Sequence, residues 1–390
     1  MSGGIVQLVA TGAQDTWLTG KPEVSFFRSN YKRYTHYSAV NERLLIQGQP
    51  TASSVSTIRF EKKGDLLNYV YLMARDSNAA PVVNMNWSNV IDKVELMIGG
   101  QVIDTQDFPY MTDIEPVTGA QTYNQRYLNN GTVSTQNPTN AQATFFPLKF
   151  FFCKDWAASL PLVALQYHDV ELRITWASNL GASTSGTSAA AAGSTYAGVQ
   201  YTAWANYVYL DQAEREFFAK NSHDMLITQV QRIPISTGAM QELALAHPVK
   251  FLAFQSVNYG VVYGDKGLTS TTASNYQLKV QINGVDVGES RHLPSYTDIA
   301  QYYNTQYGYV HNAAIANVAV VSYCLDTSKL QPTGTLNFSR LDTYRLIVPV
   351  GLIGGLKAMT NQTITTPYIY AVNYNVLRIQ NGMGSVLYSS

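Results

Sequence analysis

Short runs of alternating apolar and polar residues dominate the chain, and this period of two predicts β-strands. In the run 168–176, the alternation predicts one buried face made of Val170, Leu172, Ile174 and Trp176. Comparable runs predict strands at Val55–Phe60, Leu66–Met73, Thr144–Cys153, Leu160–Gln166, Tyr201–Leu210, Val249–Ser256, Gln277–Ile282, Asn317–Leu325, Thr335–Phe338, Tyr344–Val350 and Tyr368–Ile379. Long helices do not alternate with these strands, so the pattern excludes a doubly wound sheet and favours an all-β fold.

One combination of elements occurs twice. Lys93–Ile103 and Leu278–Val287 each read as two strands joined by a Gly-Gly or Asn-Gly turn, which is the pattern typical of a type I′ hairpin. A segment that begins near a proline and contains Thr-Asp-Ile follows each hairpin, at Phe108–Ile114 and Leu293–Ile299. We expect a short helix at both places, with Asp113 and Asp298 as its caps.

Two further echoes follow in the same order in both halves. Phe152–Asp155 resembles Tyr323–Asp326, and Asn206–Leu210 resembles Asn373–Leu377. Ordered matches indicate that one β domain is present twice in tandem. A strand-rich unit of this size, with a helix inserted after a hairpin, fits an eight-stranded jelly roll, which is a β-sandwich.

A single helix start separates the halves. Asp211 has the side chain of an N-cap and Glu214 follows three residues later, which predicts a helix through Lys220. The small-residue segment Gly181–Ser194 reads as a mobile surface loop. The predicted division is an arm at 1–24, a first roll at 25–210, a connector helix at 211–224, a second roll at 225–380 and a C-terminal tail at 381–390.

Composition adds a preference for protein contacts. Charged residues make up 13% of the chain, while tyrosine occurs 27 times and the net charge is zero. The chain has no excess of basic residues, so its charge gives no indication of direct nucleic-acid binding. A weakly charged, tyrosine-rich composition is typical of a surface that packs closely against other protein. It is also compatible with an ordinary neutral β protein. Cys153 and Cys324 read as buried free thiols of a reducing compartment, and we expect neither a signal peptide nor a membrane span.

The sequence predicts no catalytic, cofactor-binding or metal site. It lacks phosphate-loop, dinucleotide and nucleophile-elbow motifs, and the histidines are scattered. Two carboxylate pairs, Asp113 with Glu115 and Asp104 with Asp107, could form a glycosidase centre only if they faced one cleft. Because Asp113 has its echo in Asp298, a structural role is favoured for it.

The histidine–acid neighbours also favour structural roles. His168 and Asp169 lie in a predicted strand, where adjacent side chains point to opposite faces. His223 and Asp224 lie in the predicted connector and read as a turn or cap. Glycosylation motifs occur at Asn86, Asn130, Asn337 and Asn361. Without a signal peptide the usual route to their modification is closed.

Five segments together resemble a known family. They are Gly4–Asp15 with Leu18–Gly20, Leu160–His168, Tyr209–Arg215, Gln331–Arg340, and Tyr370–Arg378 with Gly382–Gly384. In this order they resemble the double jelly-roll major capsid protein of nucleocytoplasmic large DNA viruses. The resemblance covers nearly the whole chain.

The resemblance implies a structural, non-enzymatic subunit of an icosahedral virus capsid, made of two tandem eight-stranded jelly rolls with short inserted helices. It implies a homotrimer that forms a pseudo-hexagonal capsomer and contacts neighbouring capsomers and minor capsid or penton proteins. The arm at Gly4–Thr19 is expected to face the interior and the inner membrane. The location would be the virion, after assembly in the cytoplasm of the host cell. The alternatives are a carbohydrate-binding jelly-roll virion protein and a glycosidase.

Overall fold

The computed structural model describes residues 3–75, 87, 90–119, 145–178, 180, 199–236, 238–255, 277–305, 318–348 and 368–388. Contacts divide the chain into two compact units, Met1–His36 and Tyr37–Ser390. The predicted loop Gly181–Ser194 and the sequons at Asn86, Asn130 and Asn361 lie outside the described residues.

The first unit is an arm that runs to His36, beyond the end predicted at residue 24. It contains two short helices, α1 (Gly3–Gln7) and α2 (Thr16–Thr19). Its apolar side chains are exposed within the unit, Trp17 by 91% and Phe27 by 98%. The arm therefore has no core of its own.

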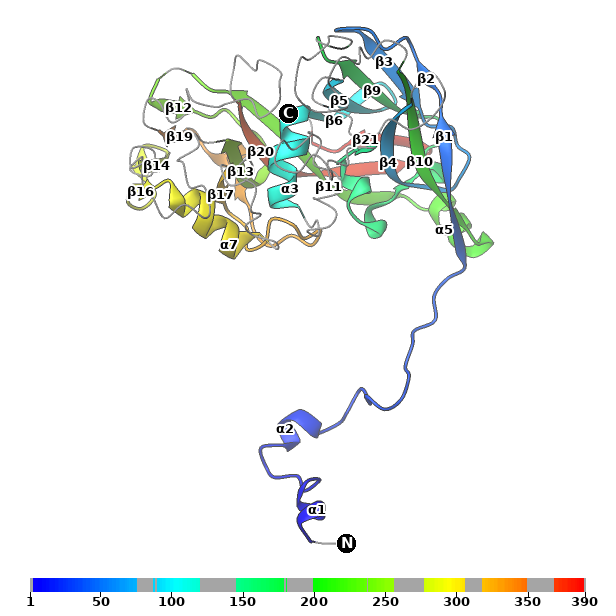
Figure 1. The fold of residues 1–390 in the computed structure, drawn as a ribbon, viewed down its shortest axis with the longest axis vertical. Coiled ribbons are helices and arrows are strands. Elements are labelled where there is room, and N and C mark those ends of the chain that lie inside the picture. Colours follow the sequence, from blue (N-terminus) through cyan, green and yellow to red (C-terminus); the bar gives the residue numbers. More distant parts are fainter. Residues whose placement is uncertain are drawn as a thin grey trace. The chain divides into compact units, whose positions relative to one another are not determined.

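In the described part of the first roll, ten strands form two facing sheets (Figure 1). The orders are β1-β10-β4-β7, with β8 on β4, and β2-β3-β9-β5-β6. The buried face predicted on β9 is confirmed, because Val170, Leu172, Ile174 and Trp176 are all buried. The strands are β1 (Tyr37–Leu44), β2 (Ile46–Gln47), β3 (Val55–Arg59), β4 (Leu66–Arg75), β5 (Ile91–Ile98), β6 (Gln101–Asp107), β7 (Phe145–Pro147), β8 (Leu160–Pro161), β9 (Val170–Trp176) and β10 (Gln200–Leu210).

The second roll repeats the plan. Its sheets have the orders β11-β20-β13-β17 and β12-β19-β14-β15, so eight strands of each roll correspond one to one and the predicted double jelly roll is confirmed. β18, β21 and β16 pair with β13, β20 and β14. The strands are β11 (His223–Pro234), β12 (Met240–Glu242), β13 (Pro248–Gln255), β14 (Gln277–Ile282), β15 (Val285–Asp286), β16 (Arg291–His292), β17 (Val318–Ser322), β18 (Leu336–Asn337), β19 (Tyr344–Ile347), β20 (Tyr368–Gln380) and β21 (Met383–Val386).

The repeated hairpins have the predicted turns. Gly99 and Gly100 have φ values of 58° and 82°, and Asn283 and Gly284 have 50° and 79°, as a type I′ turn requires. A π-helical turn follows each hairpin, η2 (Tyr110–Ile114) and η6 (Ser295–Ile299). Each continues into a short α-helix, α3 (Glu115–Thr118) or α7 (Ala300–Asn304).

The predicted caps of these helices are wrong. The N-cap residues of η2 and η6 are Pro109 and Pro294, and Asp298 lies inside η6. In the first copy the carboxylate near the helix start is Asp107, whose Oδ1 accepts a hydrogen bond from the Tyr110 amide at 3.3 Å. A side-chain oxygen that accepts from a backbone amide two or three residues further on is the usual capping geometry.

Prolines and polar side chains explain the other corrections. β7 ends at Pro147 and β8 at Pro161, because proline donates no ladder hydrogen bond, and the predicted strands continue as the 3₁₀ turns η3 (Phe151–Cys153) and η5 (Leu162–Ala164). Further 3₁₀ turns are η4 (Trp156–Ala158) and η7 (Phe338–Arg340). β11, which begins at His223 within the predicted connector, was missed because glutamines replace apolar residues along it. The predicted tail contains β21, paired with β20.

The helix between the rolls forms as predicted. α5 (Gln212–Lys220) begins after Asp211, whose Oδ1 accepts a hydrogen bond from the Glu214 amide at 2.9 Å. Its last turn carries Lys220, and a positive charge at this position stabilises the helix through the helix dipole.

In the sheet β11-β20-β13-β17, the strands β13, β17 and β20 are buried on both faces. On β13 and β20, Leu252, Phe254, Ile369 and Ala371 pack into the core of the second roll. Their neighbours Phe251, Ala253, Tyr370 and Val372 belong instead to the cluster that contains the core of the first roll. Successive side chains of a strand point to opposite faces, so this sheet fills its own sandwich and also contacts the first roll.

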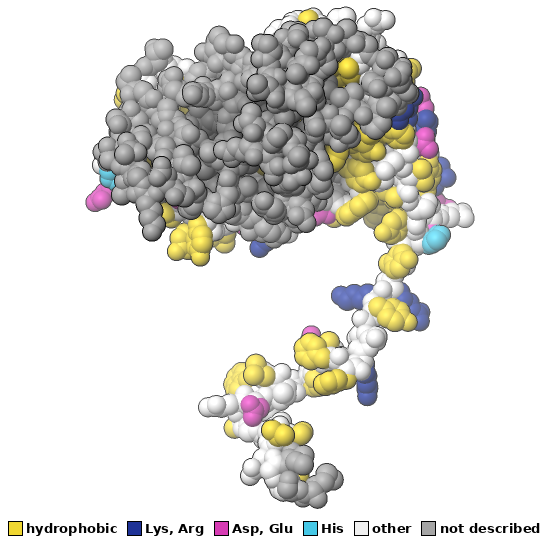
Figure 2. All heavy atoms as spheres, in the orientation of Figure 1, with side chains coloured by type: hydrophobic (Ala, Val, Ile, Leu, Met, Phe, Trp, Pro, Cys, Tyr) yellow, Lys and Arg dark blue, Asp and Glu magenta, His cyan; other side chains and the backbone are white. Residues whose placement is uncertain are grey.

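The matching sheet of the first roll has an outer face that is partly exposed. Tyr37 and Val40 on β1 and Trp156 of η4 are exposed, and Figure 2 shows hydrophobic side chains gathered on the described surface beside β1. The two rolls thus share a topology while differing in what covers the corresponding face.

The turn of the first hairpin gives a stability test. A Cβ at Gly99 would lie 2.4 Å from Nδ1 of His168, whereas a Cβ at Gly100 would meet nothing within 4 Å. Both residues have positive φ, so Gly99→Ala and Gly100→Ala share a strain of about 1–2 kcal/mol. We expect Gly99→Ala to lower the free energy of unfolding by at least about 1 kcal/mol more, from the clash. Equal urea midpoints for the two variants would contradict this account.

Candidate functional site

The candidate site is the junction between the two rolls, where buried carboxylates of the first roll bond to the second. Strand β6 of the first roll carries Asp104 and Asp107, both buried. Asp104 Oδ1 accepts a hydrogen bond from the Val230 amide on β11 at 2.9 Å, and Oδ2 accepts from Gln106 Nε2 at 2.7 Å. The Gln229 side-chain amide donates to the Ile103 carbonyl beside them. One edge of the first roll is therefore bonded directly to the second.

Asp107 forms the second part of this contact. Its Oδ2 accepts a hydrogen bond from the Tyr370 hydroxyl at 2.7 Å and lies 3.3 Å from Nη1 of Arg232. The Arg232 guanidinium in turn lies 5.1 Å from the centre of the Tyr368 ring. The same carboxylate thus holds the helix start of the first roll and two strands of the second.

Burial governs the electrostatics of both carboxylates. It raises the pKa of Asp104 to about 6, against the opposing effect of the hydrogen bonds from Val230 and Gln106. It also raises the pKa of Asp107, although the Tyr370 hydroxyl and Arg232 favour the charged form. Truncation of a partner in such a pair leaves a buried charge unpaired, which is strongly destabilising.

The C-terminal hairpin forms another contact between the rolls. The Tyr167 amide donates to the Gly382 carbonyl at 2.9 Å, and His168 Nδ1 lies 3.0 Å from the Gly384 carbonyl oxygen. Gly382 has a φ of 79°, and a Cβ there would lie 2.6 Å from the Tyr167 ring. Glycine is therefore required where the hairpin meets the first roll.

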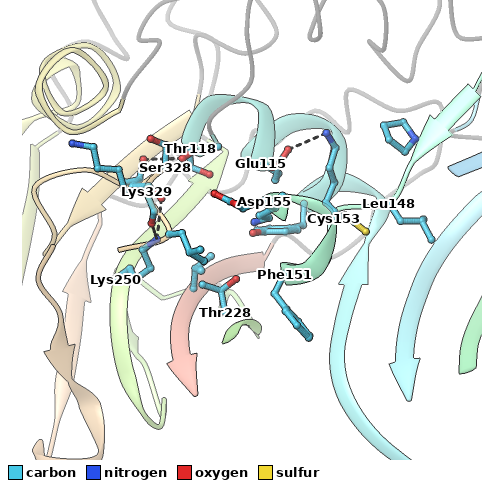
Figure 3. Close-up of a pocket in the computed structure, with 18 of the residues that line it drawn as sticks. Glu115, Thr118, Leu148, Phe151, Cys153, Asp155, Thr228, Lys250, Ser328 and Lys329 are labelled. Atoms are coloured by element: carbon cyan, nitrogen blue, oxygen red, sulfur yellow. Dashed lines mark hydrogen bonds and ion pairs between the residues drawn. The ribbon is translucent and has the colours of Figure 1, made fainter. Parts of the chain in front are cut away.

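A cavity of about 410 Å³ lies at the same junction. In Figure 3, Thr228, Lys250 and Lys329 of the second roll lie on one side and Glu115 and Asp155 of the first roll on the other. The Thr327 hydroxyl bridges the rolls here by donating to the Thr118 carbonyl at 2.8 Å. Glu115 is buried and lies 3.4 Å from Nζ of Lys149. The cavity therefore lies between the two rolls, and the Thr327–Thr118 hydrogen bond joins them beside it.

Comparisons with known proteins agree with this architecture. The family model "Major capsid protein N-terminus" matches residues 25–211, and "Large eukaryotic DNA virus major capsid protein" matches residues 214–385. The major capsid proteins of Pyramimonas orientalis virus and Paramecium bursaria Chlorella virus 1 are each 32% identical, over the full length of both chains. The chain belongs to the major capsid proteins of large eukaryotic DNA viruses.

Solved structures of major capsid proteins share the fold. The crystal structure of PBCV-1 VP54, fitted into a reconstruction of the virophage Sputnik, matches with a TM-score of 0.71 and 26% identity, covering 94% of this chain and 100% of that one. The Faustovirus major capsid protein matches with a TM-score of 0.61 at 12% identity, covering 95% and 94%. This major capsid protein is therefore a structural subunit of an icosahedral viral capsid.

The remaining sequence candidates lie apart from one another. The described part of Asp113 is backbone only, so its pairing with Glu115 is not described. Asp169 pairs with Arg59 at the surface, while His168 contacts the C-terminal hairpin. Among the described residues no group of three or more histidine, cysteine or acidic side chains could hold a metal ion.

The connector pair and the thiols have ordinary structural surroundings. His223 Nε2 lies 2.9 Å from the Phe218 carbonyl oxygen, and Asp224 pairs with Arg378 at 2.8 Å. Both cysteines are free; Cys324 is buried, and Cys153 is only partly so. Burial raises the pKa of the Cys153 thiol to about 12. Asn337 is the one sequon asparagine among the described residues, and it is exposed. Its Oδ1 accepts a hydrogen bond from the Ser339 amide at 3.1 Å.

Sequence reasoning missed most residues of the junction. Asp104 and Asp107 were considered only as a catalytic pair, and their partners were not singled out. A usable signal is the set of amide side chains on β11 and β20. Gln229 donates to the Ile103 carbonyl of the first roll, while Gln231, Asn373 and Asn375 bond within the second roll. Amides in the middle of otherwise apolar strands indicate a buried polar contact.

Asp104 gives this junction a defined pH dependence. Its pKa of about 6 in the folded protein exceeds the ordinary value of 3.8, so ionisation opposes folding. The stability contribution of the neutral acid is complete below about pH 4 and is lost as the pH rises through about 6, a change of about 3 kcal/mol. We expect Asp104→Asn to remove this loss from urea-unfolding free energies measured across that range.

Asp224→Asn is the matched control. The Asp224 carboxyl is exposed, and its hydrogen bond with Arg378 lowers its pKa. This variant should keep the fall in stability between about pH 4 and about pH 6. A fall of the same size in Asp104→Asn would show that Asp104 is not its source.

Proposed function

We propose that three chains form a pseudo-hexagonal capsomer in which the junction between the two rolls of one chain is repeated between neighbouring chains. One observation carries the proposal. Several residues of the first roll are buried at the junction. The residues at the corresponding positions of the second roll are exposed.

The counterparts follow from the repeated hairpin and helix. Ile103 and Val117 of the first copy are 3% and 2% exposed, whereas Val287 and Tyr302 of the second are 53% and 76% exposed. Ile114 and Thr118 are likewise buried, in contrast to the exposed Ile299 and Tyr303. An apolar edge of this kind is typical of a protein contact. In Figure 2 hydrophobic side chains gather at the place of α7.

A receiving face exists on the same chain. β11 and β20 of the second roll contact β6, and their counterparts in the first roll are β1 and β10. Tyr37 and Trp156, on and beside the β1 sheet, are 52% and 62% exposed. A hairpin edge at one end and an open sheet face at the other make a head-to-tail contact.

Such a contact forms a ring when its rotation closes. Six rolls joined by one kind of contact need three chains, with three contacts inside chains and three between them. The low share of charged residues, 13%, suits repeated burial of this surface. The family relationship supports this capsid role over the carbohydrate-binding alternative.

The tyrosines of the second helix test the ring. Native mass measurement should give a trimer at micromolar concentration, and Tyr302→Ser with Tyr303→Ser should raise its dissociation constant by about tenfold or more, as loss of aromatic contacts does. Phe217→Ser, on α5, removes an exposed aromatic outside the matching positions and should leave the trimer unchanged. A monomer in the unmodified protein, or equal effects of the variants, would refute the arrangement.

We further propose that the chain has no catalytic centre, cofactor or metal. Its domains are the two rolls, joined by the connector helix. The relatives are structural capsid proteins, and Asp104 and Asp107 are engaged in the junction. The virion is its location, with assembly in the host cytoplasm. The partners are neighbouring capsomers and minor capsid or penton proteins.

The arm is proposed to contact the inner membrane. The observation in support is its exposed Leu8, Trp17 and Leu18, which lack cover within their own unit. Tryptophan and leucine favour a membrane interface. Among the described residues, no helix has the length and apolar content needed to cross a bilayer.

Deletion of residues 1–24 tests this role. The trimer should persist, because the described junction residues lie outside the arm, while sedimentation with anionic phospholipid vesicles should fall at least about fivefold. Trp17→Ser with Leu18→Ser should give most of that loss, and Thr16→Ser is the matched control. Equal sedimentation of the intact and shortened proteins would contradict membrane contact.

A further inference from the structure

Lys250 is a buried ammonium at the roll junction that forms no salt bridge with any carboxylate of the described residues. It is 3% exposed and lies at a bulge of β13, where the register with β20 shifts between Val249 and Phe251. Its Nζ donates to the Thr327 carbonyl at 3.0 Å and more weakly to the Lys329 carbonyl at 3.5 Å. An ammonium carries three N–H groups, so at least one remains available to another acceptor.

The protein offers little opposite charge nearby. Nζ lies 5.1 Å from the centre of the Tyr374 ring, which is a favourable but uncharged partner. Among the described residues, no salt bridge includes Lys250. Bulges interrupt a strand so as to redirect a side chain, and they are frequent beside functional sites. The bulge here accompanies a lysine on the wall of the cavity.

The cavity itself has an excess of cations. Lys149, Lys154 and Lys329 line it together with Lys250, and the acidic lining residues are Glu115 and Asp155. Glu115 is paired with Lys149, while Asp155 Oδ1 accepts the Ala157 amide at 2.8 Å. Lys329 lies 3.7 Å from Asp326, which leaves Lys154 and Lys250 without a carboxylate among the described residues. A partly desolvated excess of positive charge favours an anion.

The rest of the lining is apolar. Phe151 of the first roll and Phe251 and Val372 of the second contribute side chains to the wall. The volume of about 410 Å³ is within the range of small-molecule sites. An anion alone would leave most of this space unfilled.

We propose that this cavity binds a small organic anion. Its carboxylate or phosphate group contacts Lys250, and its apolar body lies against Phe151, Phe251 and Val372. The ligand would touch both rolls, because the lining comes from both. Its binding therefore stabilises the roll junction of the native chain.

The electrostatics of the lysine agree with this assignment. Burial, and then the charge of Lys154, lower the pKa of Lys250 to about 8. The charge of Asp326 acts in the opposite direction but does not offset the effect of burial. A bound carboxylate or phosphate would supply a compensating negative charge.

Thermal unfolding of the full-length capsomer tests the proposal with three probes that share one alkyl chain. Nonanoate and octyl phosphate present the two head groups on the same octyl chain, and octanol presents that chain without charge. We expect a rise in the unfolding temperature of about 2 °C or more with at least one of the two anions and none with octanol. The head group that acts identifies the chemical source.

Two substitutions assign the effect to the cavity. Lys250→Met keeps the length of the side chain and should abolish the rise, whereas Lys279→Met, on β14 and paired with Asp286, should retain it. No rise with either anion, an equal rise with octanol, or an unchanged rise in Lys250→Met would overturn the proposal.

Amine acetylation of the unmodified protein decides the matter if Lys250→Met does not assemble. The active anion should slow acetylation of Lys154 and Lys329, measured by peptide mass, at least about twofold. Labelling of Lys279 should not change. Unchanged labelling of Lys154 and Lys329 at saturating anion would overturn the proposal.

Discussion

Strands β13, β17 and β20 of the sheet β11-β20-β13-β17 are buried on both faces, and the organisation of the molecule depends on that constraint. One face completes the second roll, and the other packs against the first through Phe251, Tyr370 and Val372. A sheet of this kind normally reads as a continuous apolar run. Here amides interrupt the run, and one of them, Gln229, donates to the Ile103 carbonyl of the first roll. The neighbouring edge also bonds to this sheet through the carboxylates Asp104 and Asp107. Apolar packing supplies attraction between the rolls, and the polar bonds define their register.

Buried carboxylates are a costly way to define a register. Desolvation raises the pKa of both groups, so each reduces stability at neutral pH relative to a neutral side chain. In return, a slip of β6 along β11 would leave Asp104 and Asp107 without their donors. Polar contacts of this type act as specificity devices when an apolar interface alone would allow several registers. Capsid geometry magnifies small errors of register, which is a physical reason to retain such a device.

The amino-acid pattern predicted the double jelly roll because strand alternation and hairpin chemistry are local properties. Gly99 with Gly100 and Asn283 with Gly284 adopt the expected positive φ, and Asp211 caps α5. The partners of Asp104 and Asp107 could not be predicted in this way, because they lie more than a hundred residues away along the chain. β11 was missed because glutamines interrupt its apolar pattern: Gln229 bonds to the first roll, and Gln231 bonds to Ala246 and Asn373 of its own roll. Lys250 gave no signal, because its burial follows from a bulge at the junction.

Duplication makes the difference between the two copies informative. The first copy places Ile114, Val117 and Glu115 in a junction that forms whenever the chain folds, so these side chains never face water in the native state. The second copy has Ile299, Tyr302 and Ala300 at those places, on a surface that is exposed before assembly. Tyrosine suits such a surface, because its hydroxyl is hydrated in the free subunit and its ring is available for burial. A buried carboxylate would be a poor choice there, because every assembly step would have to remove its water. The replacement of Val117 and Thr118 by tyrosines, together with the absence of an acid at the place of Glu115, is therefore the expected mark of a contact that must form between separate chains.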